Sequence, residues 1–293
     1  MYKMRRLLPF VIFLLVSLSG SAQTTRVRSK PVSVDYSEKP AAELIQQELQ
    51  IPRIPMFHAL IIGVSDYKNN GPQLPNLDRP VTDARTLYEI LTTRYAFPKQ
   101  TTTLLTNPTR EDIINSLDSL AQNITERDNL LIFYAGHGYF DKTTDFGYWL
   151  ASDARAGSRA SWIPNSTIKD YLKAIPAKHT LLISDACFGG SILKSRAISV
   201  MDSRKVFELY KDRSRKAITS GNLTLVPDES FFTSYLLKVL RENEQLILPA
   251  SSLFSRIYEP VLNNSPTVPQ FGVIQQAGDE GGDFLFIQNP SNK

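Results

Sequence analysis

The chain of 293 residues has only one cysteine, three histidines and two tryptophans. A single cysteine cannot form an intramolecular disulfide, so the fold must be stable through its hydrophobic core alone. Internal repeats and low-complexity tracts are also missing from the sequence. With an ordinary apolar fraction, these absences exclude disulfide-stapled, fibrous and disordered chains and leave a globular protein with one large domain or two small ones.

Acidic residues are missing from the first 22 positions, where Lys3, Arg5 and Arg6 lie. Without these three bases the chain keeps 30 of its 33 Lys and Arg against 29 acids. The remaining charge is therefore nearly balanced. It gives no reason to expect a nucleic-acid partner.

Residues 1–22 are typical of a secretory signal. The basic start is followed by an apolar run over residues 7–18, and small residues then precede Gln23, where we expect cleavage. We predict an exported protein, periplasmic or secreted, with no stable membrane span after signal removal. The alternative is retention by an uncleaved N-terminal anchor, for which the apolar run is short.

Composition divides the rest of the chain into a leader and one continuous unit. Residues 23–56 carry four prolines and scattered charges, which is typical of a leader, a linker or a pro-segment. Residues 57–288 are expected to form the folded unit. Within it, residues 191–216 carry eight bases and three acids, which predicts a solvated loop with one short helix around Val206 and Phe207. The functional reading of the same segment is a protease-sensitive connector. The connector separates a larger part, 57–190, from a smaller part, 217–288.

Apolar runs and helical spacing alternate through the folded unit. Continuous apolar runs predict strands buried on both faces, and apolar residues spaced three and four apart predict helices. Such alternation favours an α/β fold with about six core strands in a mostly parallel sheet and right-handed crossovers. Strands are expected at 58–64, 101–105, 128–134, 148–151, 180–183, 217–220, 270–274 and 283–287, and helices at 41–49, 80–93, 109–124, 165–174, 230–240 and 250–261.

Two chemically active side chains follow two of the buried strands. His137 lies in Ala135-Gly-His-Gly138, and Cys187 lies in Asp185-Ala-Cys-Phe-Gly-Gly190. Parallel strands end on one rim of a sheet, where open α/β proteins bind their ligands, so the two side chains are expected to become neighbours. A thiol acts as a nucleophile near neutral pH when a base or a positive group stands beside it.

Other readings of these residues remain open at this point. A free cysteine is often an apolar filler of the core. His58 and His179 begin strands and are most simply structural. If Cys187 does act as a nucleophile, the backbone amides of Gly138 and Cys187 are placed by sequence to hold an oxyanion.

The two motifs together resemble the caspase-like cysteine peptidases, especially the metacaspase and bacterial caspase-homologue branch. The histidine precedes the cysteine by about 50 residues, as in caspases. Further stretches resemble motifs of the same family: Thr82-Asp-Ala84, Phe231-Phe-Thr233 and Gly281-Gly-Asp-Phe284. The resemblance spans residues 57–288.

The resemblance implies a caspase-like αβα sandwich with a mostly parallel six-stranded sheet. It implies a cysteine endopeptidase in which Cys187 is the nucleophile and His137 the general acid and base. The amides of Gly138 and Cys187 would form the oxyanion hole, and no cofactor is required. Phe188 stands where metacaspases often have His, and nothing in the sequence explains it.

Substrate preference is implied by two acids. Asp83 and Asp185 match positions that line the pocket for a basic P1 side chain in the metacaspase-like branch, and carboxylates attract Arg or Lys. We therefore expect peptide or protein substrates cut after Arg or Lys. The alternatives are a peptidase that prefers Asp at P1 and a catalytically idle caspase-like binding or scaffold module. For Asp83 alone, the alternative is an acid favoured by the helix dipole.

Two regulatory expectations follow from the resemblance. An enzyme specific for Arg or Lys is expected to cut its own basic connector, with Lys194, Arg196 and Arg204 as candidate positions. Metacaspase-like enzymes often need calcium. The acids that follow His137 (Asp141, Asp145 and Asp153) lack the spacing of a calcium loop, so no metal site is predicted and calcium activation is only an open expectation.

Overall fold

The computed structural model describes residues 41–141, 143–186, 192–194, 206–221 and 230–289, and these belong to one compact unit. Its α-helices are α1 (Ala41–Leu49), α2 (Pro80–Arg94), α3 (Arg110–Asn123), α4 (Asn165–Ala174), α5 (Val206–Lys211), α6 (Phe231–Glu242) and α7 (Ala250–Asn264). Its strands are β1 (Phe57–Gly63), β2 (Thr102–Thr106), β3 (Asn129–Ala135), β4 (Gly138–Asp141), β5 (Phe146–Trp149), β6 (Ile163–Pro164), β7 (His179–Asp185), β8 (Leu193–Lys194), β9 (Ser214–Thr219), β10 (Ile247–Pro249), β11 (Gln270–Ile274) and β12 (Leu285–Ile287).

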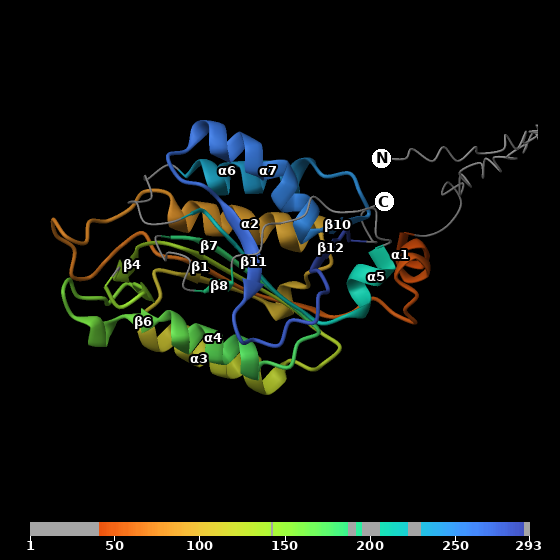
Figure 1. Ribbon diagram of the computed structural model, residues 1–293, viewed down its shortest axis with the longest axis horizontal. Helices are drawn as coiled ribbons and strands as arrows, with labels where there is room; N and C mark the ends of the chain where they lie inside the picture. The colour runs from red at the N-terminus through yellow and green to blue at the C-terminus, as the bar shows by residue number, and fades with distance from the viewer. Residues whose placement is uncertain (1–40, 142, 187–191, 195–205, 222–229, 290–293) are drawn as a thin grey trace, which may run out of the picture. The chain divides into compact units, whose positions relative to one another are not determined.

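The central sheet has the strand order β2-β1-β3-β7-β9-β11-β8. The first five strands run parallel, whereas β11 pairs antiparallel with β9 and with the two-residue β8. Figure 1 shows α2, α6 and α7 over one face and α3 and α4 over the other. The mostly parallel six-stranded sheet between two helical layers is confirmed, with β8 as a short addition at its edge.

Local signals in the sequence explain where two helices begin. Pro80 is the first residue of α2, where its missing N–H is not needed. At α3, the side chains and amides of Thr109 and Asp112 bond reciprocally in a capping box. These helix starts position the two helical layers against the sheet.

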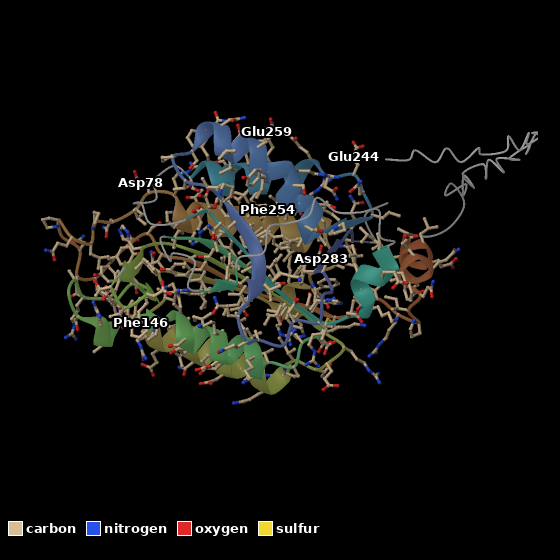
Figure 2. The ribbon with its side chains drawn as sticks, viewed as in Figure 1. Asp78, Phe146, Glu244, Phe254, Glu259 and Asp283 are labelled. Carbon is tan, nitrogen blue, oxygen red and sulfur yellow. The ribbon has the colours of Figure 1, made fainter. Side chains whose placement is uncertain are left out.

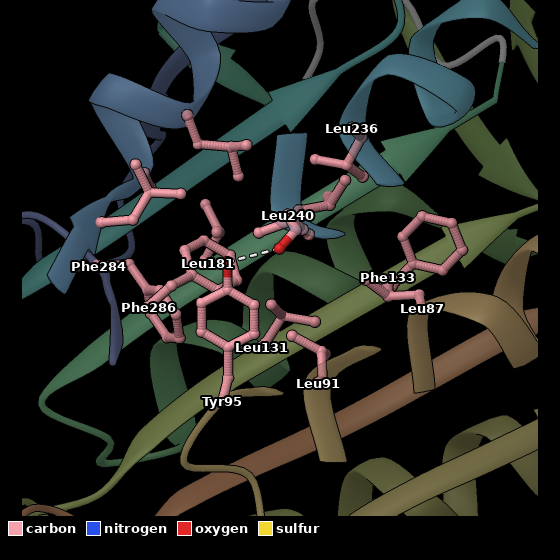
Figure 3. Packing of buried hydrophobic residues seen from close by; sticks show 14 of the residues in the cluster. Leu87, Leu91, Tyr95, Leu131, Phe133, Leu181, Leu236, Leu240, Phe284 and Phe286 are labelled. Atoms are coloured by element: carbon pink, nitrogen blue, oxygen red, sulfur yellow. Dashed lines mark hydrogen bonds between the residues drawn. The ribbon is translucent and has the colours of Figure 1, made fainter. Parts of the chain in front are cut away.

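The hydrophobic core between the sheet and α2, α6 and α7 is shown close up in Figure 3. Side chains from β3 and β7, such as Phe133 and Leu181, meet Leu87 of α2 and Leu236 of α6, and all of these are fully buried. The buried Tyr95 hydroxyl donates to the Leu240 carbonyl at 2.9 Å. Burial raises the pKa of Tyr95 to about 12, so this phenol stays protonated and keeps its hydrogen bond.

Two of the expected strands lie outside the central sheet. Among the described strands, β12 at residues 285–287 pairs with β10, and β5 at residues 146–149 belongs to a separate sheet of order β4-β5-β6. Their pairing partners β4 and β10 were not predicted because segments of three or four residues are too short to show a period. The small sheet matters for the site, because β4 follows His137 directly.

The described carboxyl end of the basic connector is not a solvated loop. β9 begins at Ser214, and Arg215 is 1% exposed. Its guanidinium donates to the carbonyls of Leu172 and Ile175, both at 3.2 Å, at the carboxyl end of α4. The prediction of a solvated loop is wrong at this end because the charge is satisfied by helix carbonyls rather than by water.

The segment before β1 also contributes to the compact unit. The helix predicted at 41–49 is present as α1, and its Ile45 and Leu49 join the hydrophobic core. Compact structure therefore begins before residue 57. Among the described helices, none has the length and apolarity needed to cross a membrane.

Candidate active site

The carboxyl ends of β1, β3 and β7 form one rim of the sheet. Gly63 is in register with Ala135, and Ala135 with Asp185. Both sequence motifs continue from this register: two residues beyond Ala135 is His137, and two residues beyond Asp185 is Cys187. Cys187 lies outside the described residues, as do Arg196 and Arg204. The backbone register thus aligns the two motifs on neighbouring strands.

The ring of His137 is held by a backbone carbonyl. Its Nε2 lies 2.8 Å from the Pro75 oxygen, and a carbonyl can only accept, so Nε2 carries the proton. In the neutral ring, Nδ1 is then the basic nitrogen. The ring also packs against Tyr67, with 5.0 Å between the ring centroids. This arrangement fixes both the tautomer and the orientation that general acid and base catalysis requires.

Two tyrosine hydroxyls hold the backbone of His137. The His137 N–H donates to the Tyr67 hydroxyl at 2.7 Å, and the Tyr134 hydroxyl donates to the His137 carbonyl at 2.6 Å. A Cβ on Gly136 would lie 3.0 Å from the Tyr134 hydroxyl and 3.1 Å from that of Tyr67. The glycine before His137 therefore leaves room for both hydroxyls. Sequence reasoning missed both tyrosines, and the only signal was a polar aromatic residue next to the Ala-Gly-His-Gly motif.

Gly138 begins β4, which is an edge strand of the small sheet among the described residues. The Leu150 N–H donates to the His137 carbonyl at 3.1 Å, so these two residues face each other as a hydrogen-bonded pair. Bonded and non-bonded pairs alternate along antiparallel strands. Gly138 and Phe140 consequently direct their N–H and C=O groups away from β5. The predicted oxyanion donor therefore faces the outer edge of β4.

The two predicted pocket acids lie at this rim and are both buried. Asp83 is in the first turn of α2, which packs so closely on β1 that a Cβ on Gly63 would meet the Pro80 carbonyl at 2.5 Å. One oxygen of Asp83 lies 3.7 Å from the guanidinium of half-exposed Arg79. Asp83 thus already has a cationic neighbour. Asp185 is the last residue of β7.

The carboxylate of Asp185 is bound on one side only. The Thr233 hydroxyl of α6 donates to Oδ2 at 2.6 Å, while Oδ1 accepts no hydrogen bond from the described residues. Burial raises the pKa of Asp185, and nearby hydroxyls of Ser230, Thr233 and Ser220 oppose this rise. Thr233 lies in a stretch that the sequence singled out, but only the fold reveals its bond to Asp185.

The acids that follow His137 do not fit a calcium site. Asp141 pairs with Arg159 at 2.5 Å and accepts the Thr143 N–H at 2.9 Å. Asp153 accepts the Arg110 N–H at 2.8 Å. Three of these four carboxylate oxygens have protein partners, and the described part of the chain contains no group of three or more acids, histidines or cysteines that could hold a metal.

The other two histidines have structural partners at the amino ends of the strands. His179 is fully buried between the Ser214 hydroxyl, 2.9 Å from Nδ1, and the Tyr210 carbonyl, 3.1 Å from Nε2. Burial lowers the pKa of His179 to about 3, so the ring stays neutral. His58 lies 3.8 Å from Asp128. Neither residue is at the rim that carries His137.

Comparisons with known proteins agree with this fold. Residues 56–276 match the model of the caspase domain family. Metacaspase-4 of Arabidopsis thaliana is 24% identical over 172 residues, which cover 54% of this chain and 40% of that protein, so the chain spans less than half of this relative. The crystal structure of a protein from Geobacter sulfurreducens shares the fold, with a TM-score of 0.53 and 19% identity over 80% of this chain and 100% of that one. Because the family model matches well over half of the sequence, this protein belongs to the caspase domain family of cysteine peptidases.

Proposed function

We propose that the protein is a cysteine endopeptidase that cuts peptide or protein substrates after Arg or Lys through a dyad of Cys187 and His137. One observation carries the proposal: the Pro75 carbonyl fixes the proton of His137 on Nε2, which makes Nδ1 the basic nitrogen at a rim in register with the Cys187 motif. A ring used only for packing would not need this placement. The family match supports the same chemistry.

In the proposed reaction, the thiolate of Cys187 attacks the P1 carbonyl carbon and forms a tetrahedral intermediate. The N–H groups of Gly138 and Cys187 donate to its oxyanion. When the C–N bond breaks, His137 gives the proton on Nδ1 to the leaving amine, and an acyl-thioester remains. Water then attacks the thioester while Nδ1 accepts a proton from it. The new peptide carboxylate leaves, and the thiolate and the protonated ring are restored.

The preference for a basic P1 side chain rests mainly on Asp185. This carboxylate is buried at the rim and has one oxygen with no partner among the described residues, so a guanidinium or ammonium group would complete its bonding. Asp83 contributes less because Arg79 already lies beside it. The same half-exposed Arg79 favours the alternative of an acidic P1 side chain, which a peptide panel tests directly.

Export and self-processing belong to the same proposal. The signal-like residues 1–22 favour an exported enzyme. Lys194, Arg196 and Arg204 are basic, as the proposed P1 preference requires, and we propose them as positions of self-cleavage. Calcium is proposed only as an activator, and one that does not act at Asp141 or Asp153, because both have protein partners.

The test is hydrolysis of short fluorogenic peptides that end in Arg, Lys or Asp, with and without calcium. We expect turnover of the Arg and Lys peptides, none by Cys187→Ala or His137→Ala, and little change in His58→Gln. His58 is the matched control because it lies at the opposite end of the sheet. A gel of the Cys187→Ala protein should show an intact connector.

Opposite results would favour other functions. No turnover of any peptide by correctly folded, connector-cleaved protein would favour the idle scaffold. Turnover of the Asp peptide alone would keep the peptidase and reverse the P1 preference. A connector that is still cut in Cys187→Ala would rule out self-processing.

A further inference from the structure

The outer edge of β4 carries backbone groups that no described strand of the protein uses. Gly138 and Phe140 direct their N–H and C=O groups away from β5. No described strand lies along this outer edge of β4. The pairing of β5 with β6 agrees with this register. It leaves Pro164, which has no N–H, opposite Tyr148, whose own N–H and C=O face β4.

From this edge we infer that β4 binds the substrate residues that follow the scissile bond, as an added parallel strand. The inference rests on the proposed function, because its starting point is the Gly138 N–H at the P1 carbonyl. Extended peptides commonly bind by adding a strand to an open sheet edge. Here the edge begins at the residue proposed to hold the oxyanion, so the occupant is continuous with the reacting bond.

The positions of the two pocket acids set the direction of the added strand. Asp83 lies on α2 and Asp185 bonds to Thr233 of α6, so a P1 side chain would point toward the layer of α2 and α6. The small sheet packs against α4, which covers the other face of the central sheet (Figure 1). The chain beyond the scissile bond therefore leaves across the rim toward β4.

Parallel pairing then assigns individual hydrogen bonds. If Gly138 N–H binds the P1 carbonyl, the next bond of a parallel ladder joins the P2′ N–H to the Gly138 carbonyl. The following bond joins the Phe140 N–H to the P2′ carbonyl. The P3′ N–H points away from β4 and makes no bond to it. An antiparallel strand would instead place P1 and P3 on this edge.

The P2′ side chain would stand beside Tyr139, on the same face of the sheet. Tyr139 is 39% exposed, and its ring packs against Trp162 with 4.8 Å between centroids. The Arg159 guanidinium lies 5.9 Å from the Tyr139 ring centroid and is fixed by Asp141. This rigid aromatic surface suits an aromatic or large aliphatic P2′ side chain, which can pack on the tyrosine ring.

The test uses the full chain and quenched-fluorescent octapeptides with Arg at P1. N-methylation of the P2′ amide should lower kcat/KM roughly tenfold, because one hydrogen bond is lost and the ladder is blocked. N-methylation of the P3′ amide is the matched control and should change kcat/KM by less than about twofold. Equal effects at both positions would overturn the inference, and so would a loss at P3 without a loss at P2′.

A second measurement concerns the side chain at P2′. Peptides with Leu or Phe at P2′ should have a higher kcat/KM than the peptide with Gly. In Tyr139→Ser, the ratio of these kcat/KM values should fall close to one. Phe146→Ser is the matched variant, because Phe146 is an exposed aromatic residue of the same hairpin on β5, opposite Asp141 (Figure 2). It should keep the ratio, and an unchanged ratio in Tyr139→Ser would contradict the P2′ assignment.

A coumarin amide of Arg, which has no residue after the scissile bond, separates the two levels of failure. If the coumarin substrate is cut and the N-methyl series is flat, only the role of β4 is wrong. If neither the coumarin substrate nor any octapeptide is cut, the proposed function is wrong, and the inference about β4 fails with it.

Discussion

Asp185 and Asp283 are both buried carboxylates, but they differ in how their oxygens are used. Asp283, labelled in Figure 2, accepts the N–H and the hydroxyl of Ser251 on Oδ2 and the Phe284 N–H on Oδ1, so both of its oxygens have partners. Asp185 has the Thr233 hydroxyl on one oxygen and no described partner on the other. Burial raises the pKa of both groups.

The difference separates a structural acid from a candidate binding acid. Asp283 caps the amino end of α7, which begins at Ala250, and its bonds tie the last strand to that helix. Buried polar atoms are nearly always hydrogen-bonded in native proteins, so the incomplete bonding of Asp185 calls for an explanation. A basic P1 side chain from the substrate would supply the missing donor.

The largest expected effect is on substrate binding by Asp185. In Asp185→Asn, kcat/KM for Arg peptides should fall by about 1000-fold, because removing one member of a buried charge pair costs about 4 kcal/mol. The unfolding free energy should change little, since the Asn oxygen can still accept from Thr233. Asp83→Asn should lose less activity, because Arg79 already neighbours that carboxylate. Equal losses at Asp83 and Asp185 would contradict the leading role of Asp185.

A smaller effect concerns the pH dependence of stability. Burial raises the pKa of Asp283 from 3.8 to about 6 in the folded protein. Between these values the folded state binds more protons than the unfolded state, so stability should fall as pH rises from about 4 to about 6, by on the order of 3 kcal/mol. Denaturant unfolding across this range should show a flatter profile in Asp283→Asn. The exposed Asp170→Asn is the control and should keep the native slope.

The smallest expected effect compares the two hydroxyls that serve these acids. Thr233→Val removes the hydroxyl that donates to Oδ2 of Asp185 and should lower the unfolding free energy by about 1.5 kcal/mol and weaken the preference for Arg peptides. Ser251→Ala leaves Asp283 its backbone amide donors and should lower stability by about 1 kcal/mol without affecting that preference. Thermal unfolding and the Arg-to-Asp turnover ratio measure both effects. An altered Arg-to-Asp turnover ratio in Ser251→Ala would contradict the assignment of Asp283 as purely structural.

Much of the fold could be predicted because its signals are local. The apolar run at 58–64 is long enough to show a buried strand, and it became β1 with a shift of one residue. The helix expected at 109–124 became α3, whose start is set by a bond between Thr109 and Asp112, three positions apart in the chain. Because parallel strands end on the same rim of a sheet, the two strands that lead to the His137 and Cys187 motifs were expected to end side by side, and β3 and β7 are parallel neighbours.

What could not be predicted depends on contacts between distant residues. Tyr67 bonds to the backbone of His137 from 70 positions away, and Thr233 reaches Asp185 across 48 positions. Neither tyrosine nor threonine is distinctive enough in sequence to mark such a partner. Arg215 was interpreted as a solvated charge for the same reason, since its acceptors at the end of α4 lie about 40 positions earlier.

The edge position of β8 has a consequence for a protein that has been nicked in its connector. β8 precedes the connector's Arg196 and Arg204 in the chain, yet it pairs with β11 beyond them and lies outside β9 and β11 in the sheet. After a cut at either arginine, the larger fragment would hold strands on both flanks of the smaller one. The strands of the two fragments would alternate within one sheet. The fragments should co-elute in gel filtration until both the β7–β9 pairing and the β11–β8 pairing are broken.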